Sequence, residues 1–315
     1  MRSQEGTVLR RHGPGPELAA EAIELTAGPG ETLVEMRLGA VTAQDRTVLG
    51  GKQPAAPFVP GSEGYGVVVS SSVAEAGAGV VIRGEGVGVT RAGLWGRYAV
   101  VPDAAVHVVP ASMEPATALA LLTPALTAHA AVRRVGEVRD GQTVVVTGIT
   151  GLVARLCAIA ARAAGAAKVV GLAGVSESVD HVAGLVDQIV RVDELGQVGR
   201  ELPWCDVAID TLGGPVTSGV LGHITPGGRL AVLGYKAGEF TTLDLHQLIG
   251  RDLRVLPVNL QRTTLAPGDV GQALADIAPA GLRPEVELLP AGRVHEVLAQ
   301  SASSTRFLLD LTALD

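Results

Sequence analysis

The chain has 315 residues, of which 47% are apolar and 18% charged, and its formal charge is −7 from 25 basic and 32 acidic residues. This size and composition predict a soluble globular protein with one large or two ordinary domains. The acidic balance, without a clustered Lys/Arg stripe, argues against nucleic acid as a partner, and the two cysteines, Cys157 and Cys205, exclude a disulfide framework and a four-thiolate zinc site.

The N-terminal segment 1-MRSQEGTVLRRHGPGPE-17 lacks the apolar core of a signal peptide. No later run approaches the roughly 20 uninterrupted apolar residues of a membrane span. We therefore expect neither secretion nor membrane insertion, and a reducing cytoplasmic location fits the low cysteine content.

The first 110 residues hold short Val-rich segments separated by Gly and Pro, which is typical of a twisted β-barrel-like domain. The expected strands lie at 33–41, 65–72, 79–89, 97–102 and 105–110. From residue 114 the pattern changes, because 114–136 has no internal glycine and is typical of two helical stretches around Pro124. A domain boundary is therefore expected near Ser112.

After this boundary strands and helices alternate, which predicts a parallel sheet with helices on both faces. The expected strands are 143–148, 168–174, 188–192, 205–210, 229–234 and 252–260, and the expected helices are 151–166, 176–186 and 215–224. The Pro- and Gly-spaced tail over 266–311 is expected to hold one helix and a final strand that returns to the first domain.

A glycine-containing turn stands where the first expected parallel strand meets its helix. Gly148, Gly151 and Ala154 follow at three-residue spacing in 144-VVVTGITGLVARLCAIAARAAGA-166. Such a turn lets the backbone approach a pyrophosphate closely and puts a small residue where helix meets strand. The strand–turn–helix context favours a dinucleotide site over the alternative, a tight βα turn without a ligand.

The second expected strand ends in 171-GLAGVSES-178, with no Asp or Glu before Glu177. An acidic residue there would bind the adenine ribose of NAD, whereas small neutral residues leave room for a 2′-phosphate. Ser176 is a candidate donor to that phosphate, and Arg191 at the end of the third strand supplies a positive charge. The alternative for Arg191 is an ordinary surface arginine. We expect NADPH rather than NADH.

Five segments resemble, in the same order, the zinc-free quinone oxidoreductase and enoyl reductase branch of the medium-chain dehydrogenase/reductases. They are 57-PFVPGSEGYGVVV-69, 118-ALALLTPALTAHAAV-132, the turn segment through Gly165, 206-DVAIDTLGG-214 and 226-PGGRLAVLGYKAG-238. The resemblance covers nearly the whole chain. It implies an α/β fold class with a GroES-like β-barrel catalytic domain (1–112 and 264–315), a Rossmann NADP-binding domain with a doubly wound parallel sheet (113–263), and commonly a homodimer.

Zinc members of this family carry a Cys, a His-Glu pair and a second Cys around the metal, but the aligned positions here hold Thr42, Ser62 with Glu63, and Thr123. Hydroxyls replace thiolate and imidazole, so no metal is expected. Without a Lewis acid, alcohol oxidation of the zinc type is not expected. Reduction of a conjugated double bond or a quinone fits better, because that acceptor is already electrophilic and needs a close hydride and a donor for the developing oxygen charge.

The hydroxyls at the replaced ligand positions are expected to converge beside the nicotinamide and bind the carbonyl oxygen of the substrate. Thr42, Ser62 and Thr123 are therefore candidate catalytic residues, together with Tyr235, which follows the strand over 229–234 and would line the pocket. The alternatives are that the hydroxyls satisfy local backbone groups and that Tyr235 is a surface aromatic.

Three further positions complete the comparison with the family. Asp45 matches a common family aspartate and is expected to form a structural ion pair, with Arg306 as its candidate partner. Many relatives have a tyrosine proton donor before the P-x-V-P-G segment, but 50-GGKQPAAP-57 lacks one. His129 stands at a position that is usually aromatic, which favours core packing over ligation.

The sequence therefore predicts an NADPH-dependent reductase that transfers hydride to an α,β-unsaturated carbonyl or a quinone, a small-molecule substrate, without a metal. Two alternatives stay open: one-electron quinone reduction, and a non-catalytic NADPH-binding protein, since Leu152 replaces a usual glycine and would crowd the pyrophosphate. A homodimer is expected to pair the edge strands over 252–260. The expected cofactor-binding residues are Thr127, Gly148, Ile149, Thr150, Gly151, Leu152, Val153, Gly174, Ser176, Arg191, Leu212, Gly234 and Tyr235.

Overall fold

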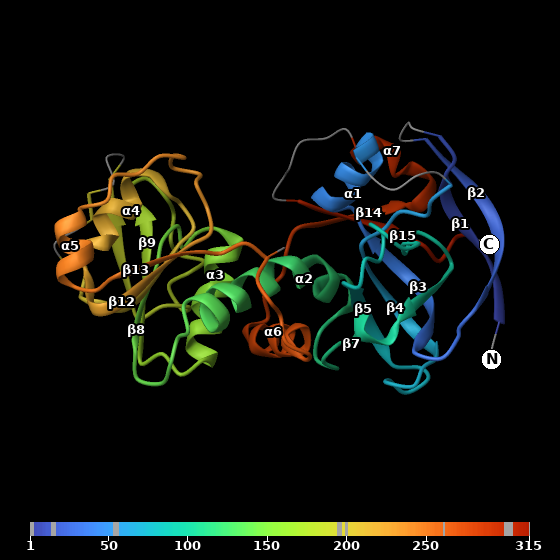
Figure 1. Ribbon diagram of the computed structural model, residues 1–315, viewed down its shortest axis with the longest axis horizontal. Coiled ribbons are helices and arrows are strands. Elements are labelled where there is room, and N and C mark those ends of the chain that lie inside the picture. The colour runs from blue at the N-terminus through green and yellow to red at the C-terminus, as the bar shows by residue number, and fades with distance from the viewer. Residues whose placement is uncertain are drawn as a thin grey trace. The chain divides into compact units, whose positions relative to one another are not determined.

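Both ends of the chain contribute to one unit of the computed structural model, and the middle of the chain makes the other (Figure 1). The model describes residues 3–13, 17–52, 57–193, 197–198, 201–260, 262–298 and 305–314. The first unit comprises Met1–Leu122 and Gly281–Asp315, and the second comprises Thr123–Ala280. The sequence placed the corresponding boundaries near residues 112 and 263.

A seven-stranded sheet forms the centre of the first unit, with the order β14-β15-β3-β4-β5-β7 and β6 added by its pairing with β3. The C-terminal strand β15 pairs parallel with β14 and antiparallel with β3. The expected return of the last strand to the first domain is therefore confirmed. The strands are β3 (Glu31–Ala40), β4 (Glu63–Ser70), β5 (Gly79–Arg83), β6 (Tyr98–Pro102), β7 (Val106–Val108), β14 (Val286–Pro290) and β15 (Arg306–Asp310).

Two further strands of the first unit were not predicted, because their charged and small residues lack the apolar runs of the others. β1 (Ser3–Arg11) and β2 (Leu18–Thr26) pair antiparallel with each other as a separate two-stranded sheet. The short helical elements of this unit are α1 (Ala43–Thr47), η1 (Val48–Lys52), η2 (Asp103–Ala105), η5 (Ala291–Arg293) and α7 (His295–Leu298).

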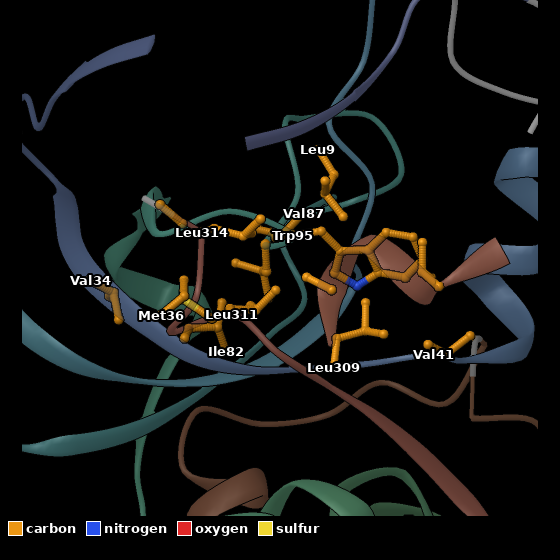
Figure 2. Packing of buried hydrophobic residues seen from close by; sticks show 14 of the residues in the cluster. Leu9, Val34, Met36, Val41, Ile82, Val87, Trp95, Leu309, Leu311 and Leu314 are labelled. Atoms are coloured by element: carbon orange, nitrogen blue, oxygen red, sulfur yellow. The ribbon is translucent and has the colours of Figure 1, made fainter. Parts of the chain in front are cut away.

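The core of the first unit is built around one tryptophan. Trp95 is fully buried, and its indole lies among Leu9, Val41 and Leu309 (Figure 2). The indole nitrogen donates to the carbonyl oxygen of Ala40 over 3.2 Å, so the ring's polar atom is satisfied. Residues from both chain ends meet in this cluster, which therefore holds β15 to the N-terminal strands.

Six strands of the second unit form one parallel sheet with the order β10-β9-β8-β11-β12-β13. Counted within the unit, this is the order 3-2-1-4-5-6 of a Rossmann fold. The predicted parallel sheet is thus confirmed. The strands are β8 (Thr143–Val146), β9 (Lys168–Gly174), β10 (Gln188–Val192), β11 (Cys205–Asp210), β12 (Ile224–Val232) and β13 (Arg254–Pro257).

Helices connect these strands, and the strand order reverses between β8 and β11. α3 runs over Leu152–Ala163 and buries one side with the i, i+3, i+4, i+7 spacing of an amphipathic helix: Ala154, Cys157, Ala158 and Ala161. The other helical elements of this unit are η3 (Ala130–Val135), α4 (Gly214–Leu221), α5 (Leu245–Gly250), α6 (Asp269–Ile277) and η4 (Ala278–Ala280).

One helix runs across the boundary between the units. α2 spans Pro115–His129 and contains Pro124. Together with η3 it covers Pro115–Val135, a stretch long and apolar enough to cross a membrane by length and composition, but 72% of its most apolar window is buried inside the protein. A buried core helix passes the same test, so this property has an explanation in packing alone.

One predicted helix is absent. The segment 176–186 forms turns rather than a helix. Val182 is its fully buried apolar side chain, and the carbonyl oxygens of Gly174 and Glu177 accept hydrogen bonds from Arg191. The bond to Glu177 satisfies a carbonyl oxygen of this segment from outside it, which local helix signals cannot anticipate.

Candidate functional site

The turn between β8 and α3 has the geometry that a phosphate-binding turn requires. Gly148 has φ +63°, and a Cβ at this position would lie 2.8 Å from Thr211 Oγ1 and 2.9 Å from Leu212 Cδ2. The amide of Gly151 donates to the Gly148 carbonyl oxygen over 2.9 Å, which closes the turn. Only glycine therefore fits at position 148 without displacing the neighbouring strand end.

The start of α3 has no side-chain cap. Gly151 is its N-cap residue, no side chain bonds to the first amides, and the first turn holds no acidic residue. These amides and the helix dipole favour an anion, and the turn's backbone is compatible with a pyrophosphate. Leu152 and Val153 are half-buried at this end, and Thr150 is half-buried in the turn.

Ile149 plays a different part from its neighbours. Its side chain is fully buried, and a Cβ on Gly171 of β9 would lie 2.7 Å from it. Its amide donates to the Leu172 carbonyl oxygen over 2.9 Å. Ile149 therefore anchors the turn to β9, and it offers a ligand backbone rather than side chain. Ala154 is buried, as the small residue at this helix–strand junction was predicted to be.

A buried aspartate, which the sequence analysis did not single out, organises the carboxyl ends of β8 and β11. Asp210 is fully buried and accepts from Thr147 Oγ1 at 2.7 Å and from Thr217 Oγ1 at 2.5 Å. It also accepts from the amides of Leu212 and Gly213 at 3.0 and 3.2 Å. This carboxylate thereby fixes the turn after β11 against the turn after β8.

Two threonines link the same strand ends directly. The amide of Thr211 donates to Thr147 Oγ1 over 2.9 Å, and Thr211 Oγ1 donates to the Thr147 carbonyl oxygen over 2.8 Å. The strand order reverses at this point, where open α/β sheets bind their ligands. A signal for these residues was present in the sequence, because Asp210 ends the expected strand 205–210 and Thr147 is the second-last residue of the expected strand 143–148.

Charged groups of both signs meet at the carboxyl end of β9, which corrects the expectation of a neutral strand end. Glu177 folds back so that its Oε2 accepts from the Gly174 amide over 2.9 Å. Arg191 Nη1 donates to the carbonyl oxygens of Gly174 and Glu177 at 2.7 and 2.8 Å. Arg191 is therefore more than a solvated surface side chain, and Ser176 is exposed in the same turn.

The loops after β11 and β12 contain the remaining predicted cofactor residues. The carbonyl oxygen of Leu212 accepts from the Ala237 amide over 2.7 Å, which ties the two loops together. A Cβ on Gly234 would lie 2.1 Å from the Thr211 carbonyl oxygen, so the loops approach closely through glycine. Tyr235 is 69% exposed within this arrangement.

In the first unit, two of the predicted hydroxyls are neighbours. Thr42 Oγ1 and Ser62 Oγ lie 3.0 Å apart. Thr42 is the N-cap residue of α1, and Asp45 lies one turn further along the same helix. Thr42 Oγ1 donates to Asp45 Oδ2 over 2.6 Å, the Thr42 amide donates to the same oxygen over 2.8 Å, and the Ser62 amide donates to Asp45 Oδ1 over 2.8 Å.

The expected ion pair between Asp45 and Arg306 is wrong. Asp45 is fully buried and holds its carboxyl group by hydrogen bonds from Thr42 and Ser62. Burial raises the pKa of Asp45, and these hydrogen bonds lower it by less. The carboxylate that acts on Arg306 is Glu63, whose negative charge raises the pKa of Arg306 against the lowering effect of burial. Glu63 Oε1 also accepts from Arg83 Nε over 2.9 Å.

Thr123 and Thr127 lie in α2 at the start of the second unit. Both are half-buried, and Thr127 Oγ1 donates to the Thr123 carbonyl oxygen over 2.8 Å. The hydroxyl of Thr127, an expected cofactor-binding residue, thus bonds within its own helix.

His129, predicted to be a core residue, is 2% exposed. Its Nε2 lies 3.3 Å from Asp269 Oδ1, and burial lowers the pKa of His129 despite that carboxylate. Asp269 also accepts from Arg134 Nε over 2.9 Å. His129 thus packs inside the second unit beside a carboxylate that an arginine already neutralises.

Among the residues that the structure describes, no group of three or more His, Cys, Asp or Glu side chains gathers as a metal site would. The hydroxyls at Thr42 and Ser62 are poor ligands for zinc, which prefers thiolate and imidazole. The donor set at these positions therefore does not fit a zinc ion.

Comparison with curated proteins finds several relatives. The synaptic vesicle membrane protein VAT-1 homolog of Rattus norvegicus is 29% identical over 231 residues, which are 68% of this chain and 54% of that protein. The putative NADP-dependent oxidoreductase YfmJ of Bacillus subtilis is 26% identical over 210 residues, 64% of this chain and 61% of that protein. The mitochondrial enoyl-[acyl-carrier-protein] reductase of Rattus norvegicus is 24% identical over 268 residues, 79% of this chain and 70% of that protein.

The chain spans about half the length of the VAT-1 homologs that it matches, 54% in the rat protein. No family model matches the chain. Among solved structures, AibC has a TM-score of 0.76 at 22% identity, with 97% of this chain and 96% of that chain covered. Escherichia coli K-12 YhdH with bound NADPH has a TM-score of 0.64 at 23% identity, with 98% and 100% covered. These structures share the fold.

Proposed function

We propose, on the premise that the chain is a relative of the quinone oxidoreductase and enoyl reductase branch of the medium-chain dehydrogenase/reductases, that it is an NADPH-dependent reductase. The curated relatives support this branch, since they include a protein named as an NADP-dependent oxidoreductase and an enoyl reductase. The observation that carries the proposal is the β8–α3 turn, where Gly148 at φ +63° precedes an uncapped helix. This arrangement is built for a dinucleotide pyrophosphate.

The cofactor belongs to the second unit in this proposal. The amides at the start of α3 bind the pyrophosphate, Arg191 and Ser176 at the end of β9 bind the 2′-phosphate, and Leu212 and Gly234 line the route toward the nicotinamide. Bound NADPH supplies the hydride. The network of Asp210 with Thr147 and Thr217 keeps the two strand ends fixed, so that the binding turn is formed before the cofactor arrives.

The substrate belongs to the first unit. Thr42 and Ser62 are assigned to the oxygen of an α,β-unsaturated carbonyl or a quinone. Such an acceptor needs a hydrogen-bond donor for the charge that develops on its oxygen, and hydroxyl groups supply one. The buried Asp45 fixes both Thr42 and Ser62 in place.

The preference for NADPH is tested at Arg191. In the Arg191→Ala variant the Kd for NADPH should rise about tenfold, because a hydrogen bond to a charged group contributes about 1.5–3 kcal/mol. The Kd for NADH should change much less, since NADH has no 2′-phosphate. Fluorescence titration with both cofactors measures the ratio. Loss of the bonds from Arg191 to Gly174 and Glu177 alone would weaken both cofactors equally, and that outcome would contradict the assignment.

The Glu177→Gln variant should change the Kd for NADPH in the opposite direction to Arg191→Ala. It removes a negative charge from the same strand end while an amide oxygen remains to accept from Gly174. We expect tighter NADPH binding with little change for NADH. Arg162→Ala, which removes a surface arginine paired with Asp187, serves as the control and should leave both Kd values within about twofold.

Turnover separates the reductase from its alternatives. Oxidation of NADPH on addition of an enone or a quinone supports an enzyme, whereas tight NADPH binding without oxidation supports a binding protein of the same fold. Transfer of deuterium from stereospecifically labelled NADPH into an enone product supports hydride transfer over one-electron reduction. No binding of either cofactor would mean that Leu152 blocks the pyrophosphate, and the reductase proposal would fail.

We further propose that the first unit is a GroES-like catalytic domain and that the protein is a homodimer. β13 pairs with β12 on one side, and no described strand pairs with its other edge. An open strand edge is a template for pairing with a second copy. Sedimentation over a range of concentrations tests this, because a dimer through this edge dissociates on dilution and a monomer shows one constant mass.

A further inference from the structure

We propose that Thr42, Ser62 and Asp45 form a proton relay, in which Asp45 stores the proton that the reduced substrate takes up at its oxygen. This inference rests on the proposed function and identifies a proton source for it. A source is needed because 50–57, where the family resemblance led us to look for a tyrosine proton donor, holds no tyrosine; part of this segment lies outside the described residues.

The three side chains are connected by two short links. Thr42 Oγ1 lies 2.6 Å from Asp45 Oδ2 and 3.0 Å from Ser62 Oγ. Two backbone amides, those of Thr42 and Ser62, hold one carboxyl oxygen each at 2.8 Å. Because these amides remain donors whether or not Asp45 carries a proton, the carboxyl group keeps its position in both states.

The protonation state of the Asp45 carboxyl group decides whether a hydroxyl proton is left for the substrate. When Asp45 is ionised, the two hydroxyl protons fill the two links, and neither hydroxyl has a proton left for a substrate. When Asp45 is protonated, three protons serve the same two links, so one hydroxyl proton is left to donate to a carbonyl oxygen. A single proton on Asp45 therefore switches the hydroxyl pair from an acceptor to a donor.

The surroundings of Asp45 favour its neutral form. Asp45 is fully buried, with 0% of its surface accessible to solvent. Burial is the largest influence on the pKa of Asp45, and it raises that pKa. The charged side chains of neighbouring elements bond elsewhere: Arg46 of α1 to the Val297 carbonyl oxygen, Glu63 of β4 to Arg83 of β5, and Arg11 of β1 to the Val48 carbonyl oxygen. The charge on Arg306 of β15 interacts with that of Glu63, which raises the pKa of Arg306.

The step balances as follows. A new C–H bond forms when the electrophilic carbon of the substrate accepts hydride from NADPH, and the electron pair of the reduced bond moves to the substrate oxygen. That oxygen takes the free hydroxyl proton, the emptied hydroxyl takes its neighbour's proton, and the Asp45 O–H bond breaks. The products are an enol, NADP⁺ and ionised Asp45, and the enol formed from a quinone tautomerises to the quinol. Water returns the proton along the same links after the product leaves.

The titration of Asp45 can be measured without any substrate. The amides of Thr42 and Ser62 report on it, because each donates to the Asp45 carboxyl group. In two-dimensional ¹H–¹⁵N NMR of the wild-type protein both amides should shift together with pH, with one midpoint above the ordinary aspartate value of 3.8. A midpoint at or below that value, or two different midpoints, would overturn the relay.

Kinetics with NADPH and 1,4-benzoquinone tests the same idea in turnover. The wild-type kcat should fall as pH rises through the midpoint found by NMR, since only protonated Asp45 leaves a hydroxyl proton to donate. Thr42→Val should lower kcat about 100-fold and remove the pH dependence, whereas Thr42→Ser should restore both. Thr47→Val, on the same helix with its hydroxyl bonded to the Ala43 carbonyl oxygen, is the control and should match the wild type.

The two proposals fail in different ways. If the protein oxidises no NADPH with any acceptor, the proposed function fails, and the NMR titration still decides whether Asp45 stores a proton. If NADPH is oxidised but the rate does not follow the NMR midpoint, or Thr42→Val turns over as fast as Thr47→Val, the reductase stands and the relay is overturned.

Discussion

The Asp210→Ala variant should lose at least about 4 kcal/mol of stability in the second unit. Thr147 Oγ1, Thr217 Oγ1 and two backbone amides donate to this buried carboxylate, and each buried donor left without an acceptor costs about 1–3 kcal/mol. Chemical denaturation followed by tryptophan fluorescence measures the effect. Trp204 reports on the second unit and Trp95 on the first, and a Trp204→Phe background separates the two signals.

Asp206→Ala is the matched control on the same strand. Asp206 accepts from the Thr143 amide at 2.8 Å in a half-buried site at the other end of β11. Water can replace it there, so we expect a loss of about 1 kcal/mol. Equal losses in the two variants would mean that Asp210 has no special part in holding the strand ends together.

The Gly148→Ala variant should weaken NADPH binding at least about 100-fold. A non-glycine residue in the left-handed region costs about 1–2 kcal/mol, and the added Cβ would press against Thr211 and Leu212 at 2.8 and 2.9 Å. The turn must open to relieve this contact, and the amides that face the pyrophosphate then lose their positions. Fluorescence titration gives the Kd, and the rise in Tm on adding NADPH gives an independent measure.

Gly184→Ala controls for the loss of a glycine elsewhere in the same unit. Nothing lies within 4 Å of a Cβ at Gly184, and its φ is not in the left-handed region. Its Kd for NADPH should equal that of the wild type. Retention of tight binding by Gly148→Ala would place the cofactor away from this turn.

The sequence could predict the second unit well because its strands are continuous Val- and Ala-rich runs separated by helices. The six parallel strands lie where these runs predicted them, with ends that differ by a few residues. No helix forms over 176–186: Arg191, distant in sequence, bonds the Glu177 carbonyl oxygen, and short-range backbone bonds at Val182 and Leu185 close turns in the rest of the segment. β1 and β2 were not predicted because they carry charged and small residues in place of a Val-rich run.

In the candidate site, too, features fixed by neighbouring residues were predictable, whereas contacts formed by folding of the side chains were not. Gly148 and Gly151 were identifiable because a turn between strand and helix constrains its own residues. The carboxylate of Glu177 at the end of β9 was not, because its side chain folds back three residues to the Gly174 amide. The partners of Asp45 were also missed, since a family position suggested an arginine whereas burial selected hydroxyls and amides.

The position of β15 between β14 and β3 has a consequence for biosynthesis. A ribosome completes the continuous second unit, Thr123–Ala280, before it adds the strand that the sheet of the first unit requires. The N-terminal strands must therefore wait for about 200 residues of later synthesis with the edge of β3 uncovered, a time of about 10–40 s at ordinary elongation rates. An uncovered edge is a target for aggregation and for chaperones, so the yield of folded protein should depend on how quickly these later residues are translated.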